Sequence, residues 1–343
     1  MKALITGGAG YFGSLLVSRL LQNGWDCKVL DINNYNAHPE VNFVQGDILD
    51  PNILDIACNN VDVIFHNVAQ VPLAKDNDLF NSVNITGTNN LLKSAKNLGV
   101  RKVIYTSSSA VYGVPSQNPV TEIMIPTPME NYGKAKYQAE KICQEYIGDD
   151  FDVTIIRPRT ILGHGRLGIF QILFEWIRTG NNIPVLGDGN NIYQFVHADD
   201  LAEAILLSAN SNIKSGLYNC GAEEYGTMRE ALENLCEFAG TGSKVKSVPF
   251  RLATFGMELT SKLGLSPLGA YHSLMYGRSM YFDNYKAKKE LGWMPTYSND
   301  DMLKSSYKWY CDNRDIILRE NKNRSKHQSV VKQGILGLLK YLL

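Results

Sequence analysis

The chain of 343 residues has no excess of charge of either sign, because Lys plus Arg and Asp plus Glu each number 34. A chain without net charge produces no overall electrostatic field that would attract nucleic acid or an anionic membrane. No nucleic-acid partner is therefore expected. The length allows one large domain or two closely packed domains with a sizeable apolar core.

The sequence also lacks paired cysteines and metal-ligand spacing. Its six cysteines are scattered without a CxxC pair, and most of them lie among apolar residues. This distribution is typical of buried free thiols in a reducing compartment, and it disfavours both a disulfide framework and a zinc site. His66, His164 and His197 have no spacing that would join them on one metal ion. We expect no metal, and we expect structural roles for these histidines.

Long apolar runs are absent as well. A strand-like run and a glycine turn begin at the N-terminus and leave no room for a secretion signal, so a cytoplasmic protein is expected. The apolar end of the chain, residues 335–343, is too short to span a bilayer and contains Lys340. Together with the basic residues before it, this stretch predicts a basic amphipathic tail over 321–343. Such a tail docks on its own protein or on a second subunit, which favours a homodimer, or makes peripheral contact with a membrane.

The first half of the chain alternates short β-type runs with segments of helical periodicity. Several of these runs are apolar almost throughout, as is required of parallel strands that are covered on both faces. Such alternation is typical of parallel strands joined by crossover helices. The expected strands are residues 2–6, 27–31, 42–45, 61–66, 102–107 and 153–157. The predicted fold class is therefore α/β, with a Rossmann-type doubly wound parallel sheet.

A glycine-rich turn follows the first expected strand and opens a helix, with the sequence Thr-Gly-Gly-Ala-Gly-Tyr-Phe-Gly at residues 6–13. Without side chains, the backbone can turn tightly and approach a pyrophosphate, whose charge is met by amide groups and the positive helix end. Asp31 closes the second expected strand, where a carboxylate accepts hydrogen bonds from the adenosine ribose and repels a 2′-phosphate. The combination predicts NAD rather than NADP as the cofactor.

The residue pattern of the sequence changes after Arg157. Repeated glycines between 163 and 189 break the chain into loops around one expected helix at 167–179. The stretch 195–209 predicts a strand end and then a helix that starts at Asp199 or Asp200 and returns to the first domain. We expect an NAD-binding domain over 1–158 with a return segment near 192–215. A smaller α/β C-terminal domain over 159–320 is expected to bind mainly the substrate.

Tyr132 and Lys136 are four residues apart, so they share a face if this segment is helical. A nearby ammonium favours the phenolate, and Lys136 is therefore expected to lower the pKa of Tyr132 toward a value useful for proton abstraction. The same spacing also fits ordinary surface residues. The three serines at 107–109 fit a polar strand end, but their position at the carboxyl edge of the expected sheet, where such sheets bind ligands, favours a functional role.

With these motifs together, the sequence resembles the extended short-chain dehydrogenase/reductase family, in its NAD-dependent epimerase/dehydratase group. The resemblance covers nearly the whole chain up to about Tyr310. It implies that Ser108 hydrogen-bonds the reacting hydroxyl or carbonyl, that Tyr132 transfers the proton and that Lys136 holds the nicotinamide ribose. The matching motifs are Thr6-Gly7…Gly10…Gly13, Asp47-Ile48, Asn84-Ile85-Thr86-Gly87-Thr88, Ser107 to Gly113, Tyr132…Lys136 and Leu291-Gly292-Trp293…Pro295.

The resemblance also implies a cofactor groove. Asp47 and Ile48 would flank the adenine, Val68 and Ala69 would line the groove, and Pro158 would lie near the nicotinamide. The full set of expected cofactor residues is Gly7, Gly10, Tyr11, Phe12, Gly13, Asp31, Ile32, Asp47, Ile48, Val68, Ala69, Tyr132, Lys136 and Pro158.

The residues after the catalytic serine bear on the type of reaction. Family members that dehydrate nucleotide sugars carry an Asp-Glu pair directly after the catalytic Ser or Thr, because elimination needs its own acid and base. This chain has Ser109 and Ala110 there, which disfavours a sugar 4,6-dehydratase. An epimerase and a net dehydrogenase would use the same residues with NAD, so both remain open.

The substrate side departs from the pattern of sugar-nucleotide epimerases. Thr160 stands where those enzymes tend to have Asn, and Tyr193 stands where many have a phosphate-binding Arg, whose charged grip tyrosine cannot replace. Arg159, Arg166 and Arg278 are candidates to supply the missing charge. The expected substrate residues are Ser109, Thr160, Arg166, Tyr193 and Arg278.

Three functions remain in view. A nucleotide-activated sugar is the favoured substrate of an NAD-dependent epimerase or dehydrogenase. The weak phosphate anchors and the amphipathic tail motivate an alternative, an oxidoreductase that resembles hydroxysteroid dehydrogenases and acts on an apolar alcohol. The third is a non-catalytic NAD-binding regulator, against which the presence of Ser108, Tyr132 and Lys136 argues.

Overall fold

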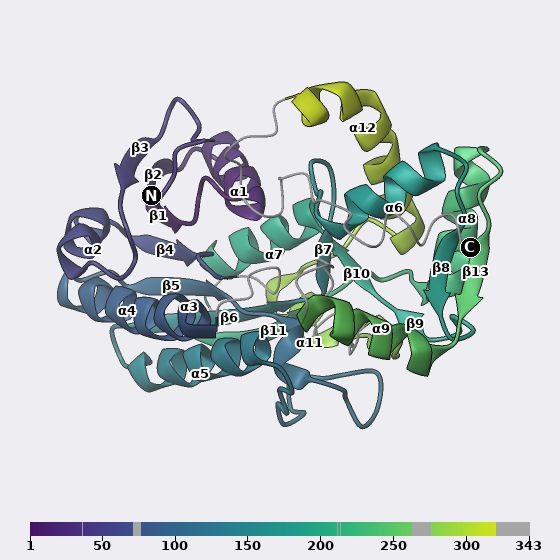
Figure 1. The fold of residues 1–343 in the computed structure, drawn as a ribbon. Helices are drawn as coiled ribbons and strands as arrows, with labels where there is room; N and C mark the ends of the chain where they lie inside the picture. The colour runs from purple at the N-terminus through teal and green to yellow at the C-terminus, as the bar shows by residue number, and fades with distance from the viewer. Residues whose placement is uncertain (36, 71–76, 211, 213, 263–275, 320–343) are drawn as a thin grey trace.

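The computed structural model describes the chain except for residues 36, 71–76, 211, 213, 263–275 and 320–343 (Figure 1). The predicted amphipathic tail at 321–343 lies outside the described residues. Every helix within the described residues is too short or too polar to cross a lipid bilayer.

A seven-stranded sheet with strand order β11-β6-β5-β4-β1-β2-β3 forms the first part of the molecule (Figure 1). All of its neighbouring strands pair in parallel. The strands are β1 (Lys2–Thr6), β2 (Asp26–Asp31), β3 (Asn42–Gln45), β4 (Val63–His66), β5 (Lys102–Thr106), β6 (Asp152–Pro158) and β11 (Gly216–Cys220). The prediction of a Rossmann-type doubly wound sheet is confirmed, and the six expected strands occur with ends shifted by at most two residues.

Helices cover both faces of this sheet. Along β1 the side chains of Ala3 and Ile5 join one core and that of Leu4 joins the other, because successive residues of a strand point to opposite faces. The first face is covered by α1 (Tyr11–Gln22) and α7 (Ala198–Asn210), and the second by α2 (Pro51–Cys58), α4 (Thr88–Asn97) and α5 (Asn131–Tyr146). The carboxyl ends of the strands form the edge of the sheet that lies between these two helix layers.

The chain leaves the sheet after β6 and returns to it through α7 and β11. On the way, β7 (Thr160–Leu162) pairs in parallel with β10 (Phe195–His197). The Leu-Gly-Trp motif that follows α11 (Tyr285–Leu291) is fixed to the start of α7. The indole of Trp293 donates to the backbone oxygen of Asp200 (2.8 Å), whose carboxylate accepts the backbone amides of Thr296 and Tyr297.

A smaller α/β region lies beside the end of the sheet (Figure 1). It has its own apolar core, in which Phe174, Leu235 and Tyr310 are buried. Its elements are α6 (Ile169–Arg178), β8 (Ile183–Leu186), β9 (Ile192–Tyr193), β12 (Gly226–Thr227), α8 (Met228–Ala239), β13 (Val245–Val248), α9 (Phe250–Lys262) and α12 (Asn299–Arg319). The predicted smaller C-terminal α/β part is therefore present, and the division of the chain at 158 remains a prediction.

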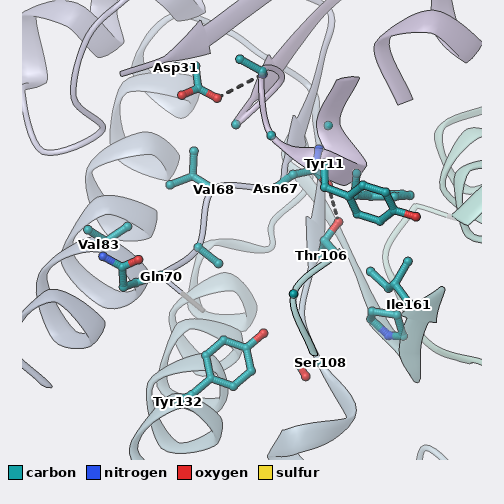
Figure 2. Close-up of a pocket in the computed structure, with 18 of the residues that line it drawn as sticks. Tyr11, Asp31, Asn67, Val68, Gln70, Val83, Thr106, Ser108, Tyr132 and Ile161 are labelled. Carbon is teal, nitrogen blue, oxygen red and sulfur yellow. Dashed lines mark hydrogen bonds between the residues drawn. The ribbon is translucent and has the colours of Figure 1, made fainter. Parts of the chain in front are cut away.

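Polar side chains connect the strand ends at the carboxyl edge of the sheet. The hydroxyl of Thr106, the last residue of β5, donates to Oδ1 of Asn67, the residue after β4 (2.7 Å, Figure 2). Deeper in the protein, the ring nitrogens of His66 hydrogen-bond the hydroxyls of Thr6 (2.8 Å) and Thr88 (2.9 Å), and burial lowers the pKa of His66 to about 3. A neutral His66 thus joins β1, β4 and α4 in a structural role.

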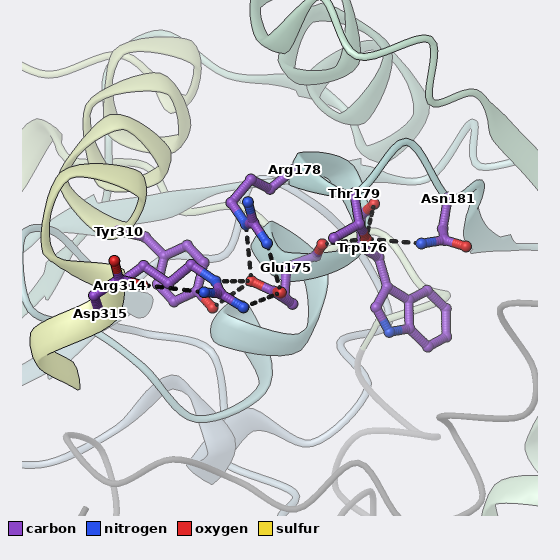
Figure 3. Close-up of polar contacts among 8 residues, drawn as sticks. All are labelled: Glu175, Trp176, Arg178, Thr179, Asn181, Tyr310, Arg314 and Asp315. Carbon is purple, nitrogen blue, oxygen red and sulfur yellow. Dashed lines mark hydrogen bonds and ion pairs between the residues drawn. The ribbon is translucent and has the colours of Figure 1, made fainter. Parts of the chain in front are cut away.

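Glu175 ties α6 to α12 (Figure 3). Its carboxylate accepts two hydrogen bonds from Arg314 (2.9 Å each), one from the Tyr310 hydroxyl (2.9 Å) and two from Arg178 (3.0 and 3.1 Å). Burial alone would raise the pKa of Glu175, but the hydrogen bonds from Arg314, Arg178 and Tyr310 outweigh burial and lower this pKa to about 2. The carboxylate therefore stays ionised at neutral pH and holds α12 in place.

Replacing Glu175 by Gln is expected to lower the free energy of unfolding by about 2 kcal/mol at neutral pH, because charge-assisted hydrogen bonds to two arginines are lost. The folded pKa lies near 2, below the unfolded value of about 4.3, so the contribution is complete above about pH 4.3 and is lost as the pH falls toward 2. Chemical unfolding between pH 7 and pH 3 should therefore show the wild-type advantage shrinking below about pH 4. Glu233→Gln, which breaks the more exposed pair with Arg229, should cost less than about 1 kcal/mol. Equal effects of the two substitutions would contradict this role of Glu175.

Candidate active site

A cavity of about 580 Å³ extends along the carboxyl edge of the sheet. Its lining begins at the glycine turn after β1 and passes Asp31 and the loop after β4. It continues to the first turn of α5 and the start of α6. Every residue predicted to bind the cofactor lines this cavity, together with Ser108, Ser109, Thr160 and Arg166. Ligands of doubly wound sheets bind at this edge, where the strand order reverses.

The glycine turn brings β1 and α1 into direct contact. The Gly7 amide donates to the backbone oxygen of Leu30 (2.8 Å), and φ of Gly7 is +70°, which disfavours any side chain there. A Cβ atom at Gly13 would lie 2.0 Å from the Gly7 carbonyl oxygen. Gly10, at the start of α1, caps the helix without a side chain. The first amides of α1 therefore lack a side-chain cap, which fits the binding of a diphosphate.

Asp31 is fixed at the end of β2. Its carboxylate accepts the backbone amides of Ala9 (3.1 Å, Figure 2) and Asn33 (3.2 Å). Burial raises the pKa of Asp31, and the backbone hydrogen bonds partly offset this effect. The carboxylate is thus oriented beside the glycine turn, where it fits the hydroxyl groups of an adenosine ribose. The glycine cradle and this acceptor together fit NAD.

The Asn-Ile-Thr-Gly-Thr motif shapes the opposite wall of the groove. Asn84 lies in a short π-helix (Ser82–Gly87) between α3 (Asn77–Asn81) and α4, and its side-chain amide pairs with both backbone groups of Gln70 (2.7 and 3.2 Å). This contact fixes the loop after β4, which carries Val68 and Ala69. A Cβ atom at Gly87 would lie 2.7 Å from the Ile48 side chain, so glycine here lets Ile48 pack against the helix.

The first turn of α5 positions Tyr132. Glu130 caps the helix by accepting the backbone amides of Tyr132 (2.7 Å) and Gly133 (2.6 Å). A Cβ atom at Gly133 would lie 2.5 Å from the Ala110 carbonyl oxygen, so only glycine allows α5 to approach the short helix Ser109–Tyr112 this closely. Tyr132 and Ser108 consequently lie on neighbouring walls of the cavity (Figure 2).

The pKa of Tyr132 is raised, contrary to expectation. Burial raises it to about 12, while the hydrogen bond with Ser108 and the charge of Arg166 offset part of this rise. The predicted lowering by Lys136 is wrong, because the ammonium is engaged elsewhere. It donates to the backbone oxygen of Thr106 (2.7 Å) and lies 4.4 Å from the ring centre of Tyr105.

Lys136 is itself a perturbed group. Its side chain is 2% exposed, and burial lowers its pKa to about 7, although the negative charge of Glu140 favours the ammonium. Lys136 therefore changes its protonation state near neutral pH in the protein without cofactor. A group poised in this way is typical of functional sites.

A buried ion pair anchors α5 to the sheet. Arg157 at the end of β6 donates to both oxygens of Glu140 on α5 (2.9 and 2.5 Å), and the Ser107 hydroxyl donates to the same carboxylate (2.5 Å). The remaining arm of Arg157 donates to the Tyr112 hydroxyl (2.6 Å). All four side chains are buried. The helix that carries Tyr132 and Lys136 is therefore locked to the strand ends beside Ser108.

Two of the predicted substrate residues do not reach the cavity. The Tyr193 hydroxyl hydrogen-bonds Thr160 (2.7 Å), and its buried ring stacks on Tyr276 (5.5 Å between centres). Tyr193 therefore supports Thr160 and is not itself among the lining residues. Arg278 is exposed and does not line the cavity either, so a contact of these two residues with the substrate stays a prediction.

Several lining residues were absent from the predicted site. Asn67 directly follows β4 and Thr106 is the last residue of β5, so the rule that ligands bind at strand carboxyl ends would have found them. Tyr276 has no signal in the sequence, because the fold brings it to the cavity from a distant segment. Arg159 was considered only as a source of charge, yet it also lines the cavity.

The buried Lys136 makes a pH-dependent prediction. An unfolded lysine has a pKa of about 10.4, so between pH 7 and 10 the unfolded state binds more protons and the wild-type protein gains stability as the pH rises. Relative to Lys136→Met, the wild type should gain about 1 kcal/mol of unfolding free energy per pH unit above pH 7. Denaturant unfolding without cofactor measures this change. The control is Lys134→Met at an exposed position, whose unfolding free energy should differ from that of the wild type by the same amount at every pH. Parallel pH profiles for wild type and Lys136→Met would refute the assignment.

Comparison with known proteins agrees with this geometry. The model of the NAD dependent epimerase/dehydratase family matches residues 3–221. The uncharacterized protein y4nG of Sinorhizobium fredii is 52% identical over 344 residues, which cover 99% of this chain and 86% of the relative. UDP-glucose 4-epimerase of Mycolicibacterium smegmatis is 28% identical over 315 residues, which cover 86% of this chain and 94% of the relative.

A solved structure shares the fold over its full length. The UDP-glucose 4-epimerase of Thermotoga maritima, crystallised with UDP-glucose, superposes with a TM-score of 0.78 at 25% identity and covers 92% of this chain and 100% of that chain. The predicted family, enzyme class and cofactor are confirmed by these matches. The chain therefore belongs to the NAD dependent epimerase/dehydratase family, within the extended short-chain dehydrogenases/reductases, and is an enzyme that uses NAD.

Proposed function

We propose that this enzyme transfers a hydride between NAD and a secondary hydroxyl of a nucleotide-activated sugar, as an epimerase or a net dehydrogenase. The observation that carries the proposal is the shared cavity, whose lining joins the glycine turn and Asp31 to Ser108 and Tyr132. The similarity to enzymes named UDP-glucose 4-epimerase supports a sugar nucleotide as the substrate class.

The proposed chemistry divides between the cofactor and three side chains. NAD, when bound, supplies the hydride acceptor and donor. Ser108 orients the substrate oxygen by a hydrogen bond, and Tyr132 moves a proton at its hydroxyl oxygen. Because the pKa of Tyr132 is about 12, the phenol is protonated at neutral pH and is ready to donate to a carbonyl oxygen. In the oxidising direction its conjugate base is favoured by Ser108 and by the charge of Arg166.

The positions after Ser108 favour epimerisation or dehydrogenation over elimination. Ser109 is buried and accepts a hydrogen bond from Arg159 (3.1 Å), and Ala110 is buried and apolar. Neither residue offers the carboxyl pair that would remove a proton and expel a hydroxyl group. We therefore assign no dehydration step to this pair.

The charge of the cavity favours a sugar nucleotide over an apolar alcohol. Arg159 and Arg166 both line the cavity. A steroid-like substrate would press hydrocarbon against these cations, which is costly, whereas an anionic substrate would compensate them. We also propose different binding roles for the two parts of the chain. Residues 1–158 hold NAD, and 159–320 supply most of the substrate wall.

Incubating the purified enzyme with NAD and UDP-glucose tests the proposal. We expect UDP-sugars to raise the melting temperature, and proton NMR to show an epimer or absorbance to show NADH. Tyr132→Phe should lower turnover by at least about 100-fold, because the proton carrier is removed, while NAD still binds. The matched control is Tyr146→Phe on the same helix, whose hydroxyl contacts Asn89.

Two outcomes would contradict the proposal. Full activity of Tyr132→Phe would remove Tyr132 from the reaction. No response to any nucleotide sugar, combined with reduction of NAD by an apolar secondary alcohol, would instead favour the hydroxysteroid-type activity.

A further inference from the structure

Arg159 is a buried cation without a counter-ion among the described residues. Its side chain lines the cavity and is only 1% exposed. Nε donates to the backbone oxygen of Gln194 (3.2 Å), and Nη1 donates to the hydroxyl of Ser109 (3.1 Å). Nη2 is buried without a hydrogen-bond partner. No carboxylate of the described residues forms an ion pair with Arg159.

Arg157, two residues earlier, is a buried arginine with a structural role, and it provides a comparison for Arg159. Its guanidinium is also buried, but Glu140 neutralises it and all three nitrogens have acceptors. A buried charge with neither a counter-ion nor a full set of acceptors destabilises the free protein. The absence of compensation at Arg159 therefore points to a ligand that brings the negative charge.

Aromatic rings hold the Arg159 guanidinium in a fixed orientation. It lies 4.8 Å from the ring centre of Tyr193 and 5.7 Å from that of Phe282. Tyr193 is in turn fixed by its stacking on Tyr276 and its hydrogen bond to Thr160. Such a rigid, planar donor suits the planar oxygens of a carboxylate.

The position of Arg159 identifies which part of the substrate carries the charge. Its Nη1 contacts Ser109, the neighbour of Ser108, and Arg159 itself directly follows Pro158 at the end of β6. The cation therefore lies at the reacting end of the cavity and not at the glycine turn. In a nucleotide sugar, the sugar ring separates the diphosphate from a reacting hydroxyl across the ring.

We propose that the substrate sugar itself carries a carboxylate, as in a nucleotide uronate, and that Arg159 recognises this group. This inference rests on the proposed function and specifies the substrate class at the same site. Arg159 is then a specificity-determining residue, since it distinguishes an acidic sugar from its neutral counterpart with the same nucleotide.

Calorimetric titration of the NAD-loaded enzyme with UDP-glucuronate and UDP-glucose tests this proposal, because the two ligands share one nucleoside diphosphate. The wild type should bind the uronate at least about tenfold more tightly. Arg159→Gln should abolish this preference by weakening the uronate alone, while its NAD affinity stays unchanged and shows an intact groove. Arg101→Gln, which alters an exposed arginine outside the cavity, should keep the preference.

Equal affinity of the wild type for the two sugars would overturn the carboxylate proposal while leaving the proposed function intact. Equal weakening of both sugars and of free UDP by Arg159→Gln would also overturn it, because the bound anion would then be the diphosphate. Binding of neither sugar would remove the proposed function and this inference with it. The wild-type comparison needs no variant, so the proposal can be tested even if Arg159→Gln fails to fold.

Discussion

The buried ion pair between Glu140 and Arg157 is the contact on which the geometry of the active site depends. Tyr132, Lys136 and Glu140 follow one another at intervals of four residues, so they lie along one face of α5. The residue that anchors the helix and the residues assigned to the chemistry therefore point the same way. Removal of either partner would leave a buried charge uncompensated and release the helix from the end of β6.

Around this neutral anchor, the site contains charges that the free protein does not neutralise. Lys136 has a pKa of about 7 because of its burial, and Arg159 has no carboxylate among the described residues. Burial of each charge reduces the stability of the fold. This loss of stability has a physical reason if bound ligands compensate the two groups, because functional sites commonly contain groups that destabilise the free protein.

The parts of the site that depend on local sequence could be predicted. The glycine turn and Asp31 belong to one strand-turn-helix-strand unit, and the spacing of Tyr132 and Lys136 needs only a helix. The errors arose where distant segments meet. Tyr193 contacts Tyr276 and Thr160 and is not among the lining residues, and the Lys136 ammonium donates to the Thr106 carbonyl oxygen rather than lowering the pKa of Tyr132. No periodicity in the sequence encodes such contacts.

The attachment of the C-terminal segments has a consequence for synthesis of the protein. All strands of the large sheet have been synthesised once the chain reaches Cys220. The amides of Thr296 and Tyr297, which bind the Asp200 carboxylate, are synthesised later, and Arg314, which binds Glu175, is synthesised later still. On the ribosome, the sheet can thus form before the substrate side is secured. A chain interrupted near residue 290 would retain the sheet strands but lose Trp293 from the core of the large sheet, together with the contacts of Asp200 and Glu175 that secure the substrate side.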